Sequence, residues 1–410
     1  MAINSFIFGG SATLGVEQAG FKVDRVLETA DAVADYNAYH FVRNRPDIPI
    51  IGPSVWENPD LVYLREGMPK DVDFGFHNCN CSGLSLINRN ASADNAVNDH
   101  FYRVAHILKE VNYKCWTLEN APALISIGMP VLKKFIGMLH HKYKFTVLRD
   151  FAANHNVPMK RQRTMIVGWN KEHFSAIPQI YMKKQKHITL RDVIGDITNI
   201  DRSNLPNHSK EDIINAGLEA LIPYCIKYDK SIDAVAGLHY DEVEHLLDDR
   251  TKKAAKKFKE RHTLKSGGIW DKSAGPTDWD FYAPSMTSMT RNIHPDGERF
   301  MTTREYARIM GYPDDFVFHE GSKAPHVQCM AQGVPVNFVK WIAEECKRNL
   351  EGDVRYLSDA DVVFQHHSNE KYEEYSLEQF NKLDKLDITK SAKLLRDPVS
   401  EESTLSGFFA

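Results

Sequence analysis

Residues 72–85 read VDFGFHNCNCSGLS, an apolar run that ends in a short polar turn. The first five residues, rich in valine and phenylalanine, predict a buried β-strand, and the Asn, Ser and Gly residues that follow predict the turn that ends it. The same unit, a short apolar run followed by a loop and a helical pattern, recurs through about the first 170 residues. This recurrence predicts a sheet whose strands are joined by helices.

Strands and helices are expected to alternate on both sides of this stretch. Such alternation is typical of an α/β fold, here a Rossmann-like, mixed and mostly parallel sheet with helices on both faces. Ligands of these sheets bind where the carboxyl ends of the strands meet, so we expect the functional loops to follow the first four strands. The other expected strands are Ser5–Phe8, Val23–Leu27, Lys114–Leu118, Phe145–Leu148 and Thr164–Gly168, and the expected helices are Ala12–Ala19, Ala32–Val42, Phe101–Val111, Thr303–Met310 and Val336–Lys347.

The composition is that of an ordinary globular protein: 410 residues, 42% hydrophobic, with a formal net charge of −4. No run of about 18 apolar residues occurs, so we expect no membrane span, and the first ten residues lack the pattern of a secretory signal. The six cysteines include no CxxC pair. This argues against a zinc site or a disulfide framework and favours a reducing, cytoplasmic compartment.

Four polar side chains stand next to predicted strands. Cys81 follows VDFGF, where a thiolate could be exposed and activated, although a cysteine beside a strand is more often a small core residue. Glu119 follows KCWTL, where burial could make it a proton donor, although a solvated acid is the simpler interpretation. Arg161 and Arg163 precede TMIVG and point the same way on an extended segment. They suit a phosphate or the carbonyl edge of a base, or else form a surface charge cluster.

The order of these residues resembles that of the DNA cytosine-5 methyltransferase family, over roughly residues 4–349. The resemblance implies a class I methyltransferase fold with a catalytic and cofactor-binding domain in 1–184, a smaller target-recognition domain in 185–282, a return to the catalytic domain in 283–350, and an acidic extension in 351–410. The matching stretches are FGGSATLGVEQAGF (8–21), VLETADAVADYNAYH (26–40), DVDFGFHNCNCSGLS (71–85), LENAPAL (118–124), NHNVPMKRQRTMIVGW (154–169), ITLRDVIGDI (188–197), APSMTS (283–288), MTTREYARIMGYPDDF (301–316) and AQGVPVNFVKWIAEE (331–345).

The resemblance also implies a reaction, the transfer of a one-carbon group, most simply methyl from S-adenosylmethionine, to C5 of a flipped-out cytosine in double-stranded DNA. Cys81 would add to C6 of the ring, and Glu119 would bond and protonate N3. Arg163, with Arg161 beside it, would hold the O2 side and stabilise negative charge. The residues expected to line the cofactor site are Phe6, Gly9, Gly10, Glu28, Thr29, Ser54, Asn80, His100, Gln332 and Val334.

The setting that the resemblance implies is the cytoplasm of a bacterium or of a phage-infected host, where such enzymes modify DNA, as in restriction–modification. We expect a monomer that binds double-stranded DNA and neither a membrane nor a metal.

Departures from the family pattern gather on the cofactor side. Phe8 stands at the first glycine of the family's first loop, where its side chain would crowd the cofactor, and Pro53 or Ser54 replaces the acid that bonds the adenine. Three interpretations follow: a methyltransferase with a remodelled S-adenosylmethionine pocket, an enzyme with the same covalent chemistry and a carboxylated or otherwise different donor, or an inactive DNA-binding relative. Transfer RNA is an alternative substrate, which the recognition insertion disfavours. Polar residues near cofactor positions are Asn80, His100 and Gln332.

Charge is unevenly distributed along the chain. The lysine-rich stretch 251–265 has helical spacing, and it either contacts phosphates or is a solvated helix face. Residues 351–410 hold 13 acidic and 7 basic side chains, a net charge of −6. This extension could be a disordered solubilising tail, a partner-binding segment or an autoinhibitory mimic of DNA, and the first interpretation is favoured, with a short helix possible at 375–386.

Overall fold

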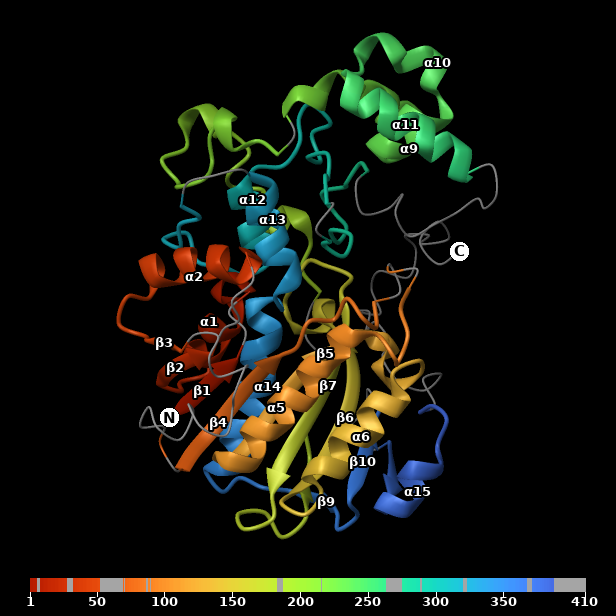
Figure 1. Ribbon diagram of the computed structural model, residues 1–410. Coiled ribbons are helices and arrows are strands. Elements are labelled where there is room, and N and C mark those ends of the chain that lie inside the picture. Colours follow the sequence, from red (N-terminus) through yellow and green to blue (C-terminus); the bar gives the residue numbers. More distant parts are fainter. Residues whose placement is uncertain are drawn as a thin grey trace.

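The computed structural model describes residues 1–5, 8–27, 32–51, 69, 71–85, 88, 90–182, 187–214, 216–262, 275–287, 290–319, 323–366 and 371–386. Among these residues, nine strands form one sheet in the order β11-β10-β6-β7-β5-β4-β1-β2-β3 (Figure 1). The strands are β1 (Ala2–Ser5), β2 (Val23–Leu27), β3 (Ile50–Ile51), β4 (Asp71–Asn78), β5 (Asn112–Asn120), β6 (Tyr143–Phe151), β7 (Gln162–Asn170), β10 (Val362–Gln365) and β11 (Tyr372–Tyr375), with β8 (Ile177–Pro178) and β9 (Tyr356–Ser358) as a separate pair.

The sheet is mixed and mostly parallel, as predicted. Strands β3, β2, β1, β4 and β5 run parallel to one another, and β7 is inserted antiparallel between β5 and β6. Strand β10 extends the sheet parallel to β6, and β11 closes that edge antiparallel to β10.

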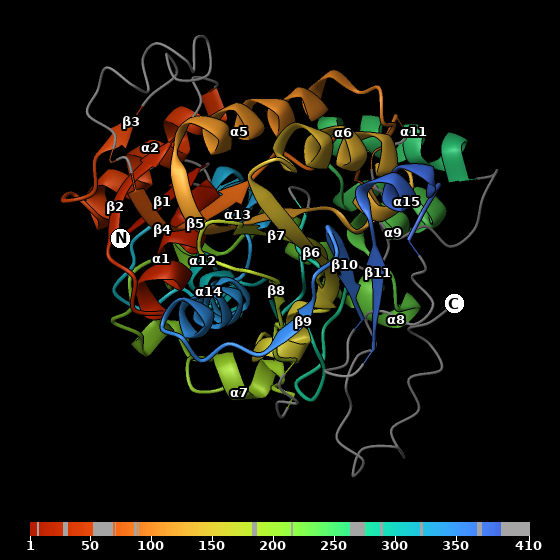
Figure 2. The same cartoon turned by 90° about the horizontal axis from the view of Figure 1, so that it is seen from below.

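Helices cover both faces of the sheet: α5 and α6 lie on one face and α1 and α14 on the other (Figure 2). None of the helices within the described ranges is long and apolar enough to cross a membrane. The helices are α1 (Ser11–Gln18), α2 (Ala32–Asn44), α5 (Asp99–Glu110), α6 (Met129–Leu139), α7 (Leu190–Ile194), α8 (Ile222–Tyr228), α9 (Ile232–Leu238), α10 (Tyr240–Val243), α11 (Asp249–His262), α12 (Thr303–Ile309), α13 (Lys323–Gln332), α14 (Val336–Leu350) and α15 (Leu377–Lys382).

The first strand lies three residues earlier than predicted, at Ala2–Ser5 instead of Ser5–Phe8. Phe8, Gly9 and Gly10 form a short 3-10 turn in which all three residues have a positive φ, of 35°, 74° and 86°. Such angles are incompatible with a strand, and glycine adopts them without the steric cost that a side chain brings. The glycine pair therefore ends the strand and turns the chain directly into α1.

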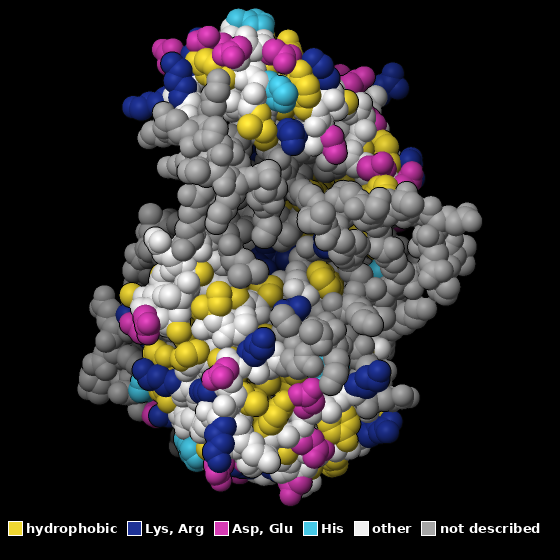
Figure 3. All heavy atoms as spheres, turned by 90° about the vertical axis from the view of Figure 1, so that its right-hand side faces the viewer, with side chains coloured by type: hydrophobic (Ala, Val, Ile, Leu, Met, Phe, Trp, Pro, Cys, Tyr) yellow, Lys and Arg dark blue, Asp and Glu magenta, His cyan; other side chains and the backbone are white. Residues whose placement is uncertain are grey.

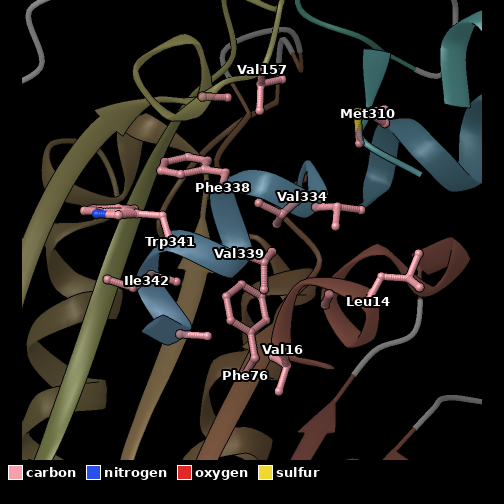
Figure 4. Close-up of a cluster of buried hydrophobic side chains, with 14 of the residues drawn as sticks. Leu14, Val16, Phe76, Val157, Met310, Val334, Phe338, Val339, Trp341 and Ile342 are labelled. Atoms are coloured by element: carbon pink, nitrogen blue, oxygen red, sulfur yellow. The ribbon is translucent and has the colours of Figure 1, made fainter. Parts of the chain in front are cut away.

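Helix α14, from the end of the family-like region, packs back onto α1 near the start of the chain. Figure 4 shows Val339 of α14 beside Phe76 of β4 and Val16 of α1. The contact is close because α1 carries Gly15: a Cβ there would lie 2.6 Å from Val339 Cβ and 2.7 Å from the backbone oxygen of Val336. A side chain at this position could not be accommodated without moving one helix.

A separate helical layer lies above the carboxyl ends of the strands (Figure 1). Helices α8 to α11 have their own apolar core, which also includes Ile293 and Phe300 from the segment that follows. Residues 251–262 of the lysine-rich stretch lie on α11, as the spacing predicted, and Lys253 and Lys256 are exposed there, whereas 263–265 lie outside the described residues. The proposed division of the chain at residues 184, 282 and 350 stays a prediction.

The disorder favoured for the acidic extension is wrong for residues 351–366 and 371–386. Val362, Val363 and Phe364 are fully buried in β10, with Val363 facing one core and its two neighbours the other. Three consecutive apolar residues make a strand that is covered on both faces, and an average charge over 60 residues conceals so short a run. The rest of the extension, 367–370 and 387–410, lies outside the described residues.

The α1–α14 contact yields a stability prediction. Gly15→Ala should lower the free energy of unfolding by about 1–3 kcal/mol, since the added methyl group meets backbone that cannot move aside. Gly137→Ala in α6 is the matched control, because a Cβ at Gly137 meets nothing within 4 Å. That change should raise stability by up to about 1 kcal/mol through helix propensity. Urea unfolding of both variants measures the difference, and equal effects would contradict the close packing.

Candidate active site

The predicted catalytic residues meet at the carboxyl ends of β4 and β5, next to the start of β7. In register, Asn78 of β4 lies opposite Glu119 of β5, and Glu119 lies opposite Met165 of β7. The Cys81 turn follows β4 directly. The arginine segment enters β7 beside it, so Cys81 and Arg163, 82 positions apart in sequence, lie at the same end of the sheet.

Glu119 is buried, with 1% of its surface exposed, and its Oε1 lies 2.5 Å from Nε of Arg163. The two groups form an ion pair without the alignment of a good hydrogen bond. Burial raises the pKa of Glu119, while Arg163 and Arg161 oppose that rise. The carboxyl group is therefore placed to hold a proton at higher pH than an exposed glutamate does.

The two neighbouring cysteines have different environments. Cys79 is fully buried, and both desolvation and the charge of Glu119 raise the pKa of its thiol, which disfavours the reactive thiolate. Cys81 is half-buried at the turn, three residues beyond Asn78. The turn is held by bonds from Ser82 N–H to Asn80 Oδ1 (3.0 Å) and from Leu84 N–H to the Cys81 carbonyl (3.1 Å). Of the two thiols, only that of Cys81 is accessible to a substrate.

Asn120 connects the end of β5, which carries Glu119, to the loop that carries Cys81. It was not among the predicted site residues. Its Nδ2 donates to the Cys79 carbonyl (3.3 Å), and its Oδ1 accepts from the N–H of Ala121 (2.8 Å). The asparagine thus fixes the spacing between Glu119 and the Cys81 turn. Its place beside Glu119 at the end of a predicted strand was the available signal.

Arg161 is buried and binds backbone rather than facing the site opening. Its guanidinium donates to the carbonyls of Met286 (2.9 Å), Ala331 (2.6 Å) and Gly333 (2.9 Å). Desolvation and the nearby Arg163 charge lower its pKa, and the negative charges of Glu119 and Cys81 raise it. Arg161 is therefore close enough to both groups to interact electrostatically, but its hydrogen bonds serve to join segments.

The described cofactor-side residues form two groups. Asn80 lies in the Cys81 turn, and His100 lies in the first turn of α5, which packs against that loop: a Cβ at Gly83 would lie 2.5 Å from Asn98 Oδ1. The second group is the Gly9–Gly10 turn together with Gln332 and Val334. These meet closely, since a Cβ at Gly333 would lie 2.8 Å from the Phe8 carbonyl oxygen. Phe6, Glu28, Thr29, Ser54 and Pro53 lie outside the described residues.

Phe8 does not stand free in the cofactor loop. It is 8% exposed, and its side chain belongs to the apolar core that includes helices α5 and α6. Its positive φ shows that the fold imposes a strained backbone at this residue, which the surrounding packing maintains.

Two buried amide atoms on the same side of the sheet have no hydrogen-bond partner: Nδ2 of Asn78 and Oε1 of Gln332. Asn78 is 1% exposed and shares a sheet face with Phe76 and, across the strands, with Glu119. An unpaired buried polar atom costs about 1–3 kcal/mol, which a bound polar group would recover. The Gly9–Gly10 turn, the Asn78 donor and the Gln332 acceptor together fit a cofactor that carries polar groups. Strand alternation could have indicated Asn78 from the sequence.

Helices α8 to α11 lie above the end of the sheet that carries the candidate site (Figure 1). Figure 3 shows Lys and Arg side chains deep in the hollow between the two lobes. Within the described ranges, no cluster of His, Cys, Asp and Glu is arranged to hold a metal ion.

Known proteins resemble the chain along most of its length. The family model for C-5 cytosine-specific DNA methylase matches residues 7–348. Type II methyltransferase M.MthTI of Methanothermobacter thermautotrophicus is 26% identical over 361 residues, covering 86% of this chain and 98% of that protein. Type II methyltransferase M.XorII of Xanthomonas oryzae is 25% identical and covers 78% of each chain.

Solved structures share the fold. A prophage-encoded E. coli protein superposes with a TM-score of 0.58 at 20% identity, covering 85% of this chain and 99% of that one. The Entamoeba histolytica methyltransferase EhMeth gives a TM-score of 0.55 at 12% identity, with coverages of 85% and 98%. With the family model matched from the Gly9–Gly10 turn through α14, this chain belongs to the C-5 cytosine-specific DNA methylase family and is an enzyme of the DNA (cytosine-5) methyltransferase type.

Proposed function

We propose that this protein transfers methyl from S-adenosylmethionine to C5 of a cytosine in double-stranded DNA, through a covalent bond between Cys81 and C6. The observation that carries the proposal is the pairing of a half-buried thiol at Cys81 with a buried carboxyl group at Glu119 whose pKa is raised. Attack at C6 and protonation at N3 require one nucleophile and one acid on the same ring. The DNA modified is that of the bacterium or phage-infected cell that makes the protein.

The proposed chemistry proceeds on the base. The Cys81 thiolate adds to C6 while Glu119 gives a proton to N3, and the ring electrons move to C5, which becomes nucleophilic. Arg163, paired with Glu119, stabilises negative charge near the ring. Loss of the C5 proton after transfer and elimination across C5–C6 then release Cys81. The cytosine must leave the duplex to reach this pocket, because its C6 is enclosed within the stacked helix.

S-adenosylmethionine, when bound, supplies the electrophilic methyl group. The Gly9–Gly10 turn brings backbone close to the ligand, and Asn80, His100, Gln332 and Val334 would surround it. Asn78 would bind a polar part of the ligand through the N–H that has no partner within the described residues.

A donor with an additional polar group, such as carboxylated S-adenosylmethionine, is a second candidate. The observation that favours it is the buried, unpaired Nδ2 of Asn78, a hydrogen-bond donor from which a carboxylate on the transferred group would accept. Incubation with each donor separately, followed by the mass of the modified nucleoside, distinguishes the candidates. A product with only the carboxylated donor would replace the methyl proposal, and transfer to tRNA instead of DNA would change the substrate class.

Removal of the nucleophile tests the proposed function. Cys81→Ala should abolish the modified nucleoside, because the ring cannot then be activated at C6. Cys79→Ala is the matched control two residues away and should keep most of the activity, since that thiol is buried. Nucleoside mass analysis of a cytosine-containing duplex measures both. Full activity in Cys81→Ala would exclude the covalent route.

Glu119 yields a pH prediction. The acid must be protonated to act, so the rate should fall as pH rises through the pKa of Glu119, which burial raises above its ordinary value. Glu119→Gln should slow single-turnover transfer roughly 10²–10⁴-fold and remove this alkaline decline. Glu110→Gln, at the exposed end of α5, should keep both rate and profile. The same decline in Glu119→Gln would show that another group is titrating.

Arg161 and Arg163 should differ in what they contribute. Arg161→Lys replaces a guanidinium group that donates to three carbonyls by a single ammonium group. Because some of these hydrogen bonds are lost, the free energy of unfolding should fall by about 1.5–3 kcal/mol or more. Arg163→Lys keeps a charge near Glu119 and should reduce the transfer rate more than the stability. Urea unfolding and single-turnover assays measure the two effects. Equal stability losses would contradict the distinction.

A further inference from the structure

The C-terminal extension lies outside the family match, which ends at residue 348, yet it is part of the central sheet. The Asp361 carbonyl accepts from Phe145 N–H (2.9 Å), and Val362–Gln365 then pairs in parallel with β6. The Gln365 side chain bonds both the N–H and the carbonyl of Ile180. Lys144 is held by the carbonyls of Ser175 (3.2 Å) and Asp359 (2.8 Å). These contacts fix the extension to the catalytic domain.

After β10 the chain turns back in the antiparallel β11, and α15 then begins beside the amino end of β10, away from the candidate active site. Asp361 Oδ2 accepts from the N–H of Leu377 (2.8 Å) at the start of α15, whose Phe380 is fully buried against the α6 side. The described part of the extension ends at Leu386, which is 1% exposed. There the Leu386 N–H donates to the carbonyl of Ile125 (3.1 Å).

Ile125 belongs to the loop that follows the proposed acid. Residues Pro122–Ile125 form a 3-10 turn only a few positions beyond Glu119. The Pro122 carbonyl accepts from Thr164 Oγ1 (3.5 Å) next to Arg163, and Asn120 bonds the Cys79 carbonyl. A continuous set of contacts thus runs from Leu386 through this loop to the strand end that carries Glu119 and to the loop that carries Cys81.

We propose that the extension is a positioning element for the active site: by bonding Ile125, it holds the 121–128 loop and thereby keeps Glu119 buried and aligned with Cys81. This proposal rests on the proposed function of Glu119. A chain of packed and bonded groups can transmit position in this way, and reacting groups displaced by about 1 Å lose roughly 10²-fold in rate.

The test uses full-length variants at the last described contact. Leu386→Gln introduces an amide into the apolar contact and should displace the segment from Ile125. Lys385→Gln is the matched control, since Lys385 is exposed and adjacent. We expect Leu386→Gln to increase amide hydrogen exchange in residues 121–128 and to lower the single-turnover rate roughly tenfold or more. Its alkaline decline should move to lower pH, because solvent reaching Glu119 removes part of the burial that raises its pKa.

Lys385→Gln should match the wild type in hydrogen exchange, rate and pH profile. Leu386→Met, which keeps an apolar side chain at the contact, should also match the wild type. The pH profile separates positioning from a general loss of stability, which would lower the active fraction without moving the profile. Unchanged exchange and rate in a folded Leu386→Gln overturn the inference. If Leu386→Gln fails to fold, Leu386→Ala serves with the same expected directions. Absence of cytosine modification by the wild type would count against the proposed function, and hydrogen exchange would still decide whether Leu386 holds the loop.

Discussion

A buried guanidinium joins segments of this protein that are far apart in sequence. Arg161, at the entry to β7, donates hydrogen bonds to carbonyls of Met286, Ala331 and Gly333. Met286 lies in the segment that follows helices α8 to α11, Ala331 lies at the end of α13, and Gly333 lies in the turn before α14. A buried charge is costly unless its donors are satisfied, so each segment is held where its carbonyl meets the guanidinium. The position of α14 on α1, and the close approach of Gly333 to the Phe8 turn, are consistent with this constraint.

Differences in burial give chemically identical side chains in the candidate site different reactivity. Cys79 and Cys81 are identical side chains two residues apart, yet desolvation and Glu119 raise the pKa of the first while the second is half-buried at the turn. Glu119 itself is balanced between desolvation, which raises its pKa, and Arg163 and Arg161, which lower it. The same end of the sheet therefore carries one accessible thiol and one buried acid. The proposed reaction needs both, because one group attacks the ring and the other protonates it.

Two sequence-based expectations were wrong for local reasons. The first strand was predicted through Phe8, because an apolar run does not reveal that Phe8, like the glycine pair that follows it, has a positive φ. The extension was favoured as disordered because its mean charge is acidic, whereas three buried apolar residues at 362–364 suffice to add a strand when a sheet edge is available. Composition averaged over a segment cannot detect a partner that lies elsewhere in the chain.

The sequence by itself determined the alternation of strands and helices and the order of Cys81, Glu119, Arg161 and Arg163, because periodicity and motif spacing are local patterns. Only the tertiary structure decided that Arg161 binds backbone and Arg163 pairs with Glu119, although the two arginines are equivalent in the pattern. It also decided the contribution of Asn120 and of the extension's bond to the acid loop. Burial, strand register and neighbouring charge depend on residues distant in sequence, and these quantities set what each side chain can do.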